Sequence, residues 1–125
     1  TPIARPSSIS KKSVGQIAED LADLTSRARR KALKPEEYQG AGISLSNLGM
    51  FRVDEFSAII TPPEAAVLAV GRIVQTPVVR DGRAEPGHRM RMTLSADHRV
   101  IDGVIAAKYL EEVAARLENP WQLLR

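Results

Sequence analysis

Residues 65–70 read Ala-Ala-Val-Leu-Ala-Val, the longest uninterrupted apolar run in this chain of 125 residues. Two prolines, Pro62 and Pro63, precede it, and an apolar run bounded in this way is typical of a strand buried on both faces. The run is far too short to cross a membrane. It therefore predicts the central strand of a sheet, and we expect some of its neighbouring strands to lie outside this chain.

A second strand pattern lies upstream of this run. Ile43 and Leu45 alternate with Ser44 and Ser46, which predicts a strand with one polar face. Residues 47–49, Asn-Leu-Gly, are turn-forming and end the pattern.

Downstream, residues 73–79 are expected to be extended, with Pro77 favouring the edge of a sheet or a bend. Asp81-Gly82 is a strong signal for a hairpin turn. Alternating apolar and polar residues over 89–95 predict the strand that returns from this turn.

Amphipathic helices are predicted near the two ends of the chain, the first after Ser10 and the second from about Asp102 to Glu118, where Asn119-Pro120 ends it. Their apolar stripes are Val14, Ile17, Leu21, Leu24 and Ala28 in the first, and Ile105, Leu110, Val113, Ala114 and Leu117 in the second. The order of elements predicts an α/β (α+β two-layer) fold, a mixed sheet flanked by helices.

The composition excludes several kinds of site. With no cysteine and two histidines, the chain cannot form disulfides, thiolate metal sites or a histidine-rich metal centre. Its net charge of +3 is mild, and the basic cluster at residues 27–34 contains no aromatic residue. That cluster fits a nucleic-acid surface less well than the cationic last turn of a helix. We therefore expect no metal, no nucleic-acid partner and no membrane span.

The segment that carries chemistry is residues 95–103, Ser-Ala-Asp-His-Arg-Val-Ile-Asp-Gly, between the last predicted strand and the last helix. A carboxylate at Asp102 could hold one ring nitrogen of His98 and leave the other free as a base. Ser46 is a candidate third member, because it ends a strand just before a tight turn. Spacing alone leaves two interpretations open, and favours a hydrogen-bonded structural histidine over a catalytic one.

Several segments also resemble one family. Residues 95–103 match the pattern S-x-D-H-R-x-x-D-G of the dihydrolipoamide acyltransferases, the E2 components of 2-oxo acid dehydrogenase complexes. Residues 43–51 resemble the family's T-I-S-N-L-G-M-F segment, residues 56–66 its F-x-A-I-I-x-P-P-x-A-A segment, and residues 34–40 its K-L-x-P-E-E-Y-x-G segment. The segments occur in the family's order, so the resemblance covers essentially the whole chain.

The resemblance implies a fold like that of chloramphenicol acetyltransferase, a CoA-dependent acyltransferase whose homotrimer has active sites between subunits. It implies transfer of an acyl group between dihydrolipoyl-lysine and coenzyme A, with the lipoyl group supplied by a separate domain and no metal. The segments quoted above resemble acetyl-transferring members of pyruvate or acetoin complexes most. The alternative is a non-catalytic structural core or assembly component of such a complex.

The resemblance also implies roles for single residues. His98 matches the general base that takes the proton from the attacking thiol, since the thiolate is the nucleophile. Ser46 matches the hydroxyl that hydrogen-bonds the oxyanion, and the serine and histidine of one site come from different subunits. Asp102 matches a carboxylate that supports the site through an ion pair with an upstream arginine, and it also suits the start of a helix.

Four further positions are interpreted beside these. Asp97 and Arg99 are expected to support the site structurally, and Asn47, next to Ser46, is a candidate CoA contact. Arg52 stands where the family often has glycine, and arginine adopts positive φ only at a cost, so we expect a local difference in this turn. His88 is expected to be exposed and without a role.

The family's catalytic domain is about twice as long as this chain. We therefore interpret residues 1–125 as its C-terminal part, which begins in mid-domain with a strand near residues 1–3, contains no lipoyl or subunit-binding domain, and is expected to be inactive alone.

The partners implied are the N-terminal half of the domain, the other copies of a homotrimer, a lipoyl domain, and the E1 and E3 components. Leu123 and Leu124 are expected either to dock a neighbouring trimer in a cubic or icosahedral core or to pack within the chain. The expected location is the bacterial cytoplasm, or the mitochondrial matrix in a eukaryote.

Overall fold

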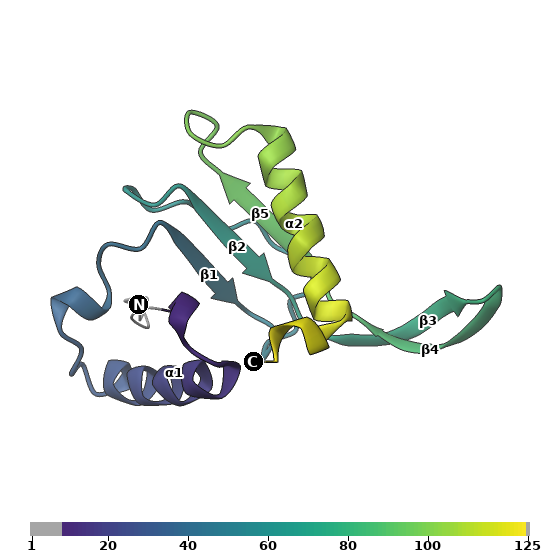
Figure 1. The fold of residues 1–125 in the computed structure, drawn as a ribbon, viewed down its shortest axis with the longest axis horizontal. Coiled ribbons are helices and arrows are strands. Elements are labelled where there is room, and N and C mark those ends of the chain that lie inside the picture. The colour runs from purple at the N-terminus through teal and green to yellow at the C-terminus, as the bar shows by residue number, and fades with distance from the viewer. Residues whose placement is uncertain (1–8, 125) are drawn as a thin grey trace. The chain divides into compact units, whose positions relative to one another are not determined.

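The computed structural model describes residues 9–124, and Figure 1 shows their elements. Within these residues, α1 (Val14–Arg29) and α2 (Gly103–Glu118) stand on either side of five strands along the chain. The chain divides into two compact units, one of residues 42–106 and one of residues 1–41 with 107–125. The strand predicted near residues 1–3 lies outside the described residues.

Three strands form the sheet of the unit 42–106. In Figure 1, β2 (Ala66–Val70) lies between β1 (Ile43–Asn47), which is parallel to it, and β5 (Met92–Ala96), which is antiparallel to it. All five residues of β2 are buried, which confirms the predicted central strand. The expectation that its neighbouring strands are partly missing is wrong, because this chain pairs both edges of β2.

β1 shows the reverse of the burial that its alternation suggests. Ser44 is 4% exposed, whereas Ile43 and Leu45 are 44% and 57% exposed. Within the described residues β1 pairs only with β2, so it forms one edge of this sheet. The predicted strand and its end at residues 47–49 are confirmed, but its apolar side is not the buried one.

A two-stranded hairpin, β3 (Val74–Arg80) with β4 (Arg83–Arg89), projects away from this sheet (Figure 1). Its turn is Asp81-Gly82, whose φ angles of 50° and 74° are those that a type I′ turn requires. The predicted turn is therefore confirmed. The strand predicted over residues 89–95 is confirmed for residues 92–95, which lie in β5. Its assignment as the strand that returns from the turn is wrong, because β4 pairs with β3 immediately after the turn and β5 pairs with β2.

The composition of β4 explains why the sequence did not predict it as a strand. Pro86 faces Pro77 in the register, which a two-stranded ribbon tolerates because each strand pairs on one edge only within the described part of the chain. Gly87 is buried, and a Cβ there would lie 2.5 Å from Cγ2 of Val78. The strand therefore depends on two residue types that usually argue against a strand.

A tight loop closes against the end of β2. A Cβ on Gly71 would lie 2.0 Å from the carbonyl oxygen of Asp54, so only glycine fits there. The N–H of Arg72 donates to the carbonyl of Val53 at 2.9 Å, and its guanidinium pairs with Asp54 and lowers the pKa of that carboxyl. Arg52, in the same loop, is not among the residues with positive φ, so the strain considered for it does not arise.

α1 begins with a capping box. Oγ of Ser13 accepts from the N–H of Gln16, and the Gln16 side chain accepts from the N–H of Ser13. The helix starts after Ser13, and not directly after Ser10, because Ile9–Lys11 form a short 3₁₀ turn first. Leu24 is the one buried residue of α1, and the rest of the predicted stripe is half-buried or exposed.

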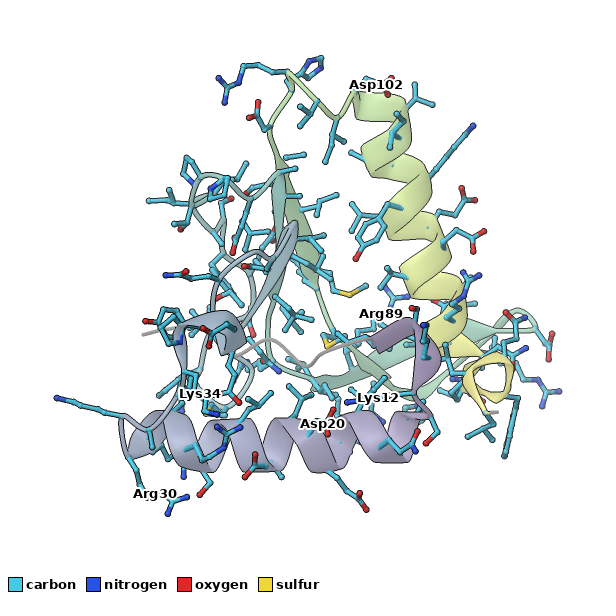
Figure 2. All side chains as sticks on the ribbon, turned by 60° about the vertical axis from the view of Figure 1, so that its left-hand side comes forward. Lys12, Asp20, Arg30, Lys34, Arg89 and Asp102 are labelled. Carbon is cyan, nitrogen blue, oxygen red and sulfur yellow. The ribbon has the colours of Figure 1, made fainter. Side chains whose placement is uncertain are left out.

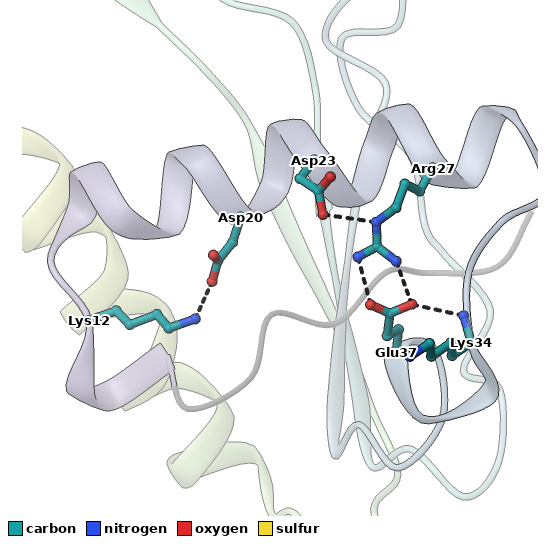
Figure 3. Close-up of polar contacts among 6 residues, drawn as sticks. All are labelled: Lys12, Asp20, Asp23, Arg27, Lys34 and Glu37. Carbon is teal, nitrogen blue, oxygen red and sulfur yellow. Dashed lines mark hydrogen bonds and ion pairs between the residues drawn. The ribbon is translucent and has the colours of Figure 1, made fainter.

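An ion-pair group joins the end of α1 to the 3₁₀ turn Pro35–Glu37, as Figure 3 shows. The guanidinium of Arg27 donates to both carboxylate oxygens of Glu37, at 2.8 and 2.6 Å, and to Asp23 at 2.9 Å. The N–H of Lys34 donates to Glu37 at 2.8 Å. The arginine, together with this N–H, holds the pKa of Glu37 at about 2.

The predicted last helix is confirmed as α2, but its stripe is not buried. No residue of α2 is buried, and the stripe is half-buried at Leu110, Val113 and Ala114 and exposed at Ile105 and Leu117. The 3₁₀ turn Pro120–Leu123 follows, where Trp121 is 75% and Leu123 38% exposed. This end of the chain therefore presents apolar side chains to its surroundings.

The Arg27–Glu37 pair predicts a pH dependence of stability. The pKa of Glu37 is about 2 in the folded state against an ordinary 4.5, so the pair stabilises the fold above pH 4.5 and loses its effect as the pH falls toward 2. We expect Glu37→Gln to lower the urea midpoint most above pH 4.5, and progressively less below it. Glu36→Gln, in the same turn, is the matched control. A pH-independent difference for Glu37→Gln would contradict the assignment.

Candidate active site

The turn between β5 and α2 presents His98 on a firmly held backbone. The N–H of Asp97 donates to the carbonyl of Ala65 at 2.8 Å, which ties the turn to the residue before β2. The carbonyl of Asp97 accepts from the N–H groups of Val100 and Ile101, at 3.0 and 2.9 Å. Backbone bonds thus enclose His98, whose side chain is exposed.

The carboxylate of Asp97 is fully engaged by Arg99. It accepts from the Arg99 backbone N–H at 3.0 Å and from the guanidinium at 3.0 Å (Nε) and 2.8 Å (Nη2). These hydrogen bonds lower the pKa of Asp97 to about 2 and raise the pKa of Arg99. Asp97 and Arg99, the residues on either side of His98, are therefore hydrogen-bonded to each other, and these bonds hold the turn.

Asp102 is the N-cap of α2. Its Oδ1 accepts from the N–H of Ile105 at 2.9 Å, and its carbonyl accepts from the N–H of Ala106 at 3.0 Å. Figure 2 labels Asp102 at the first turn of the helix. The structure gives no hydrogen bond between Asp102 and His98, so within this chain the carboxylate orders the helix start and does not orient the imidazole.

Ser46 and His98 lie at different ends of the sheet. Ser46 is level with Ala69 and Thr93 in the register, three positions away from the row of Ala96, after which the turn with His98 begins. Two strand spacings and three residue rises put Ser46 and Ala96 about 14 Å apart. One chain by itself therefore does not bring the hydroxyl of Ser46 to the imidazole of His98.

Asn47 shapes the turn after β1. Its Oδ1 accepts from the N–H of Gly49 at 2.8 Å. A Cβ on Gly49 would lie 2.9 Å from that oxygen and 3.0 Å from the carbonyl oxygen of Gly71. The amide of Asn47, considered as a CoA contact from the sequence, thus has a local structural partner on its oxygen.

The sheet register shows a polar feature that the sequence reasoning missed. Ser44 and Ser46 lie in the same rows as Ser95 and Thr93, so the polar positions of β1 and β5 share one face. The alternation in each strand was visible in the sequence. The polar positions of β1 and β5 could not be assigned to the same face without knowing that β5 pairs with β2 and not with the hairpin.

Within residues 9–124, no group of three or more histidine, cysteine, aspartate or glutamate side chains is placed to hold a metal ion. No helix in this part of the chain has the length and apolar character to cross a membrane.

Comparison with known proteins identifies the family. Residues 3–125 match the family described as 2-oxoacid dehydrogenases acyltransferase (catalytic domain). The chain belongs to this family, and the resemblance stated from its motifs is confirmed.

Two curated relatives are components of pyruvate dehydrogenase complexes. The mitochondrial dihydrolipoyllysine-residue acetyltransferase component of Schizosaccharomyces pombe is 48% identical over 115 residues, which are 89% of this chain and 24% of that protein. The mitochondrial pyruvate dehydrogenase protein X component of Mus musculus is 43% identical over 130 residues, 98% of this chain and 25% of that protein. The chain therefore spans about a quarter of the length of these relatives.

Solved structures confirm the fold. A dihydrolipoamide acetyltransferase of Azotobacter vinelandii, studied for the catalytic role of a serine, a histidine and an asparagine, matches with a TM-score of 0.83 and 35% identity. The cubic core of a pyruvate dehydrogenase multienzyme complex matches with a TM-score of 0.83 and 34% identity. Both matches cover 90% of this chain and 46% of the other, so this chain corresponds to just under half of each.

Substitution at Asp102 tests its role as a helix cap. Asp102→Ala removes the acceptor for Ile105 and should lower the free energy of unfolding by about 1 kcal/mol, whereas Asp102→Asn keeps an acceptor oxygen and should change it little. Chemical denaturation measures both variants, with Glu111→Ala on α2 as a control. Equal stability of the alanine and asparagine variants would show that the cap does not contribute.

Proposed function

We propose that the chain is the C-terminal part of the catalytic domain of a dihydrolipoamide acetyltransferase. Such an enzyme moves an acetyl group between dihydrolipoyl-lysine and coenzyme A in a 2-oxo acid dehydrogenase complex of the pyruvate or acetoin type. One observation carries the proposal. The serine and histidine studied in the Azotobacter vinelandii enzyme are 52 positions apart, and its asparagine follows four positions later. Ser46, His98 and Asp102 have the same two spacings.

The proposed chemistry uses His98 and Ser46, because the carboxylates of Asp97 and Asp102 already have hydrogen-bond partners within the chain. The exposed imidazole of His98 takes the proton from the thiol, because the thiolate is the attacking form. The half-buried hydroxyl of Ser46 donates to the oxyanion that forms when the thiolate attacks the thioester carbonyl. The proton then returns from His98 to the departing thiolate, so that the step is balanced without a metal.

Asp102 differs from the asparagine of the solved relative, and the difference fits its contacts. Asparagine and aspartate both offer a side-chain oxygen to the backbone N–H groups of a helix start. Asp97 and Arg99 hold the turn around His98 and do not take part in proton transfer.

The separation of Ser46 from His98 implies that each site is shared between two chains. We propose a homotrimer in which Ser46 of one copy faces His98 of the next, completed by the N-terminal half of the domain. The exposed Leu123 and Leu124 are proposed to join trimers into a larger core, as the likeness to a cubic core suggests. A lipoyl domain and the E1 and E3 components are the remaining partners, in the bacterial cytoplasm or the mitochondrial matrix.

A second candidate is a structural core component without acyltransferase activity. The specific observation in its favour is that the mouse relative is named only as protein X component of the complex, at 43% identity. The presence of Ser46 and His98 favours the enzyme. Activity of the full-length protein separates the two candidates.

The full-length protein that contains this chain should transfer acetyl groups from acetyl-CoA to dihydrolipoamide, and prefer them to isobutyryl and succinyl groups. His98→Ala should lower kcat by about 10² to 10⁴, the effect of losing a positioned base. His88→Ala, on the exposed hairpin, is the matched control and should leave kcat unchanged. A loss below tenfold would reject His98 as the base, and a folded wild-type protein without activity would favour the structural component. The 125-residue chain alone should be nearly inactive.

Mixing two inactive variants tests the sharing of each site between chains. Ser46→Ala and His98→Ala should each be nearly inactive, and unfolding and refolding them together should create some sites with both side chains intact. Random assembly of equal amounts predicts about one quarter of wild-type activity, because each site needs an intact serine from one copy and an intact histidine from another. Activity no higher than that of the separate variants would argue for sites within one chain.

A further inference from the structure

One face of the three-stranded sheet carries hydroxyl groups from two strands that are not adjacent. Cross-strand partners, and residues two apart along a strand, point to the same side of a sheet. Two neighbouring rows of the register place four hydroxyls on one side, and we call these the hydroxyl face: Ser44 and Ser95 across Val67, and Ser46 and Thr93 across Ala69.

The opposite face of the same strands is mainly apolar. Its three rows alternate with the hydroxyl rows and contain Ile43, Leu45, Leu68, Val70, Leu94 and Met92, together with Ala66, Ala96 and one polar residue, Asn47. The hydroxyl groups thus lie on one face of the sheet and most of the large apolar side chains on the other. The hydroxyl face is therefore a property of the sheet as a whole and not of one strand.

Within residues 9–124, Ser44 leaves one hydroxyl of this face without a partner. The residue is 4% exposed, and its Oγ has no hydrogen-bond partner among the described residues. A buried hydroxyl without a partner is unfavourable, so such groups in native proteins generally meet a protein group, water or ligand. Ser46, Thr93 and Ser95 are partly exposed on the same face, so a ligand can reach them.

The composition of the hydroxyl face selects the kind of ligand. It contains no charged side chain, so it lacks the cations by which proteins usually hold phosphate groups. A hydroxyl both donates and accepts hydrogen bonds, which suits neutral amides. Val67 and Ala69 provide small apolar surface between the hydroxyls, which suits methylene groups.

We propose that the hydroxyl face binds the amide-bearing thiol arm of the acyl-transfer substrates, with Thr93 and Ser95 as contact residues beside Ser46. The proposal rests on the proposed function and adds a binding surface to it. The two thiol substrates share this chemistry, since the pantetheine arm of CoA and the dihydrolipoyl-lysine arm are both neutral chains of methylenes and amides.

The register fixes how such an arm would lie. Ser46 and Thr93 occupy one row, two strand spacings or about 10 Å apart. They are too far apart to hold one oxygen together. An arm laid across the strands instead places its thioester at Ser46 and an amide at Thr93, and Ser95 lies in the neighbouring row.

The test uses the full-length protein and the variants Thr93→Val and Ser95→Ala. Calorimetry measures the Kd of pantetheine, CoA and dihydrolipoamide, and steady-state kinetics measures KM and kcat. Loss of one hydrogen bond should raise Kd and KM for the bound arm by about 2- to 12-fold, with kcat changed less than twofold. Thr76→Val, a half-buried threonine on the hairpin, is the matched control and should change neither.

Comparing the Kd values of the three ligands identifies which substrate arm the hydroxyl face binds. Equal weakening of pantetheine and CoA assigns the face to the pantetheine arm, weakening of dihydrolipoamide assigns it to the lipoyl arm, and weakening of all three assigns it to both. Thr93→Ser keeps the hydroxyl and should restore binding if Thr93→Val loses it, which separates a lost contact from a damaged fold.

Failure of this inference is distinguishable from failure of the proposed function. If the wild-type protein transfers acetyl groups while Thr93→Val and Ser95→Ala bind all three ligands as Thr76→Val does, the hydroxyl face is not the binding surface. If the wild-type protein neither binds these thiols nor transfers acetyl groups, the proposed function itself is wrong.

Discussion

The pairing of β2 on both of its edges is the constraint on which the other features depend. Its five buried residues hold β1 in parallel and β5 antiparallel, and each row of three residues is set by these two registers. The rows decide that Ser46 and Thr93 are level and that His98 lies past the other end of the sheet. The loop around Gly71 and the turn at Asp97 then bind to the two ends of β2 through backbone hydrogen bonds.

The part of the fold that could be predicted from sequence is the part that local chemistry dictates. An apolar run makes β2, Asp81-Gly82 makes the turn, and Asn119-Pro120 ends α2, because each signal acts within a few residues. β4 could not be recognised, since Pro86 is tolerated at the edge of a ribbon and Gly87 is required by its close approach to Val78, which local sequence does not reveal. The pairing of β5 with β2 is a long-range choice that no local pattern states.

The candidate site shows the same division. The motif around His98 is read directly from the sequence, and the structure explains why it contains so many polar residues. Asp97 engages Arg99, and Asp102 caps α2, so both carboxylates have structural partners within the chain. The sequence predicted Asp102, from its spacing, and Ser46, from its place at the end of a strand, beside His98. Within one chain they do not, because strand geometry separates Ser46 and the helix cap occupies Asp102.

Among residues 9–124, the outer edge of β1 pairs with no strand, and this has a consequence for how the protein is handled. The five residues of β1 contain no lysine, proline or bulge, the devices by which natural edge strands discourage pairing with foreign strands. Its exposed Ile43 and Leu45 add apolar surface beside the open hydrogen-bonding groups. We therefore expect an uncovered β1 edge to favour pairing with foreign strands, which makes this edge a site from which aggregation can start.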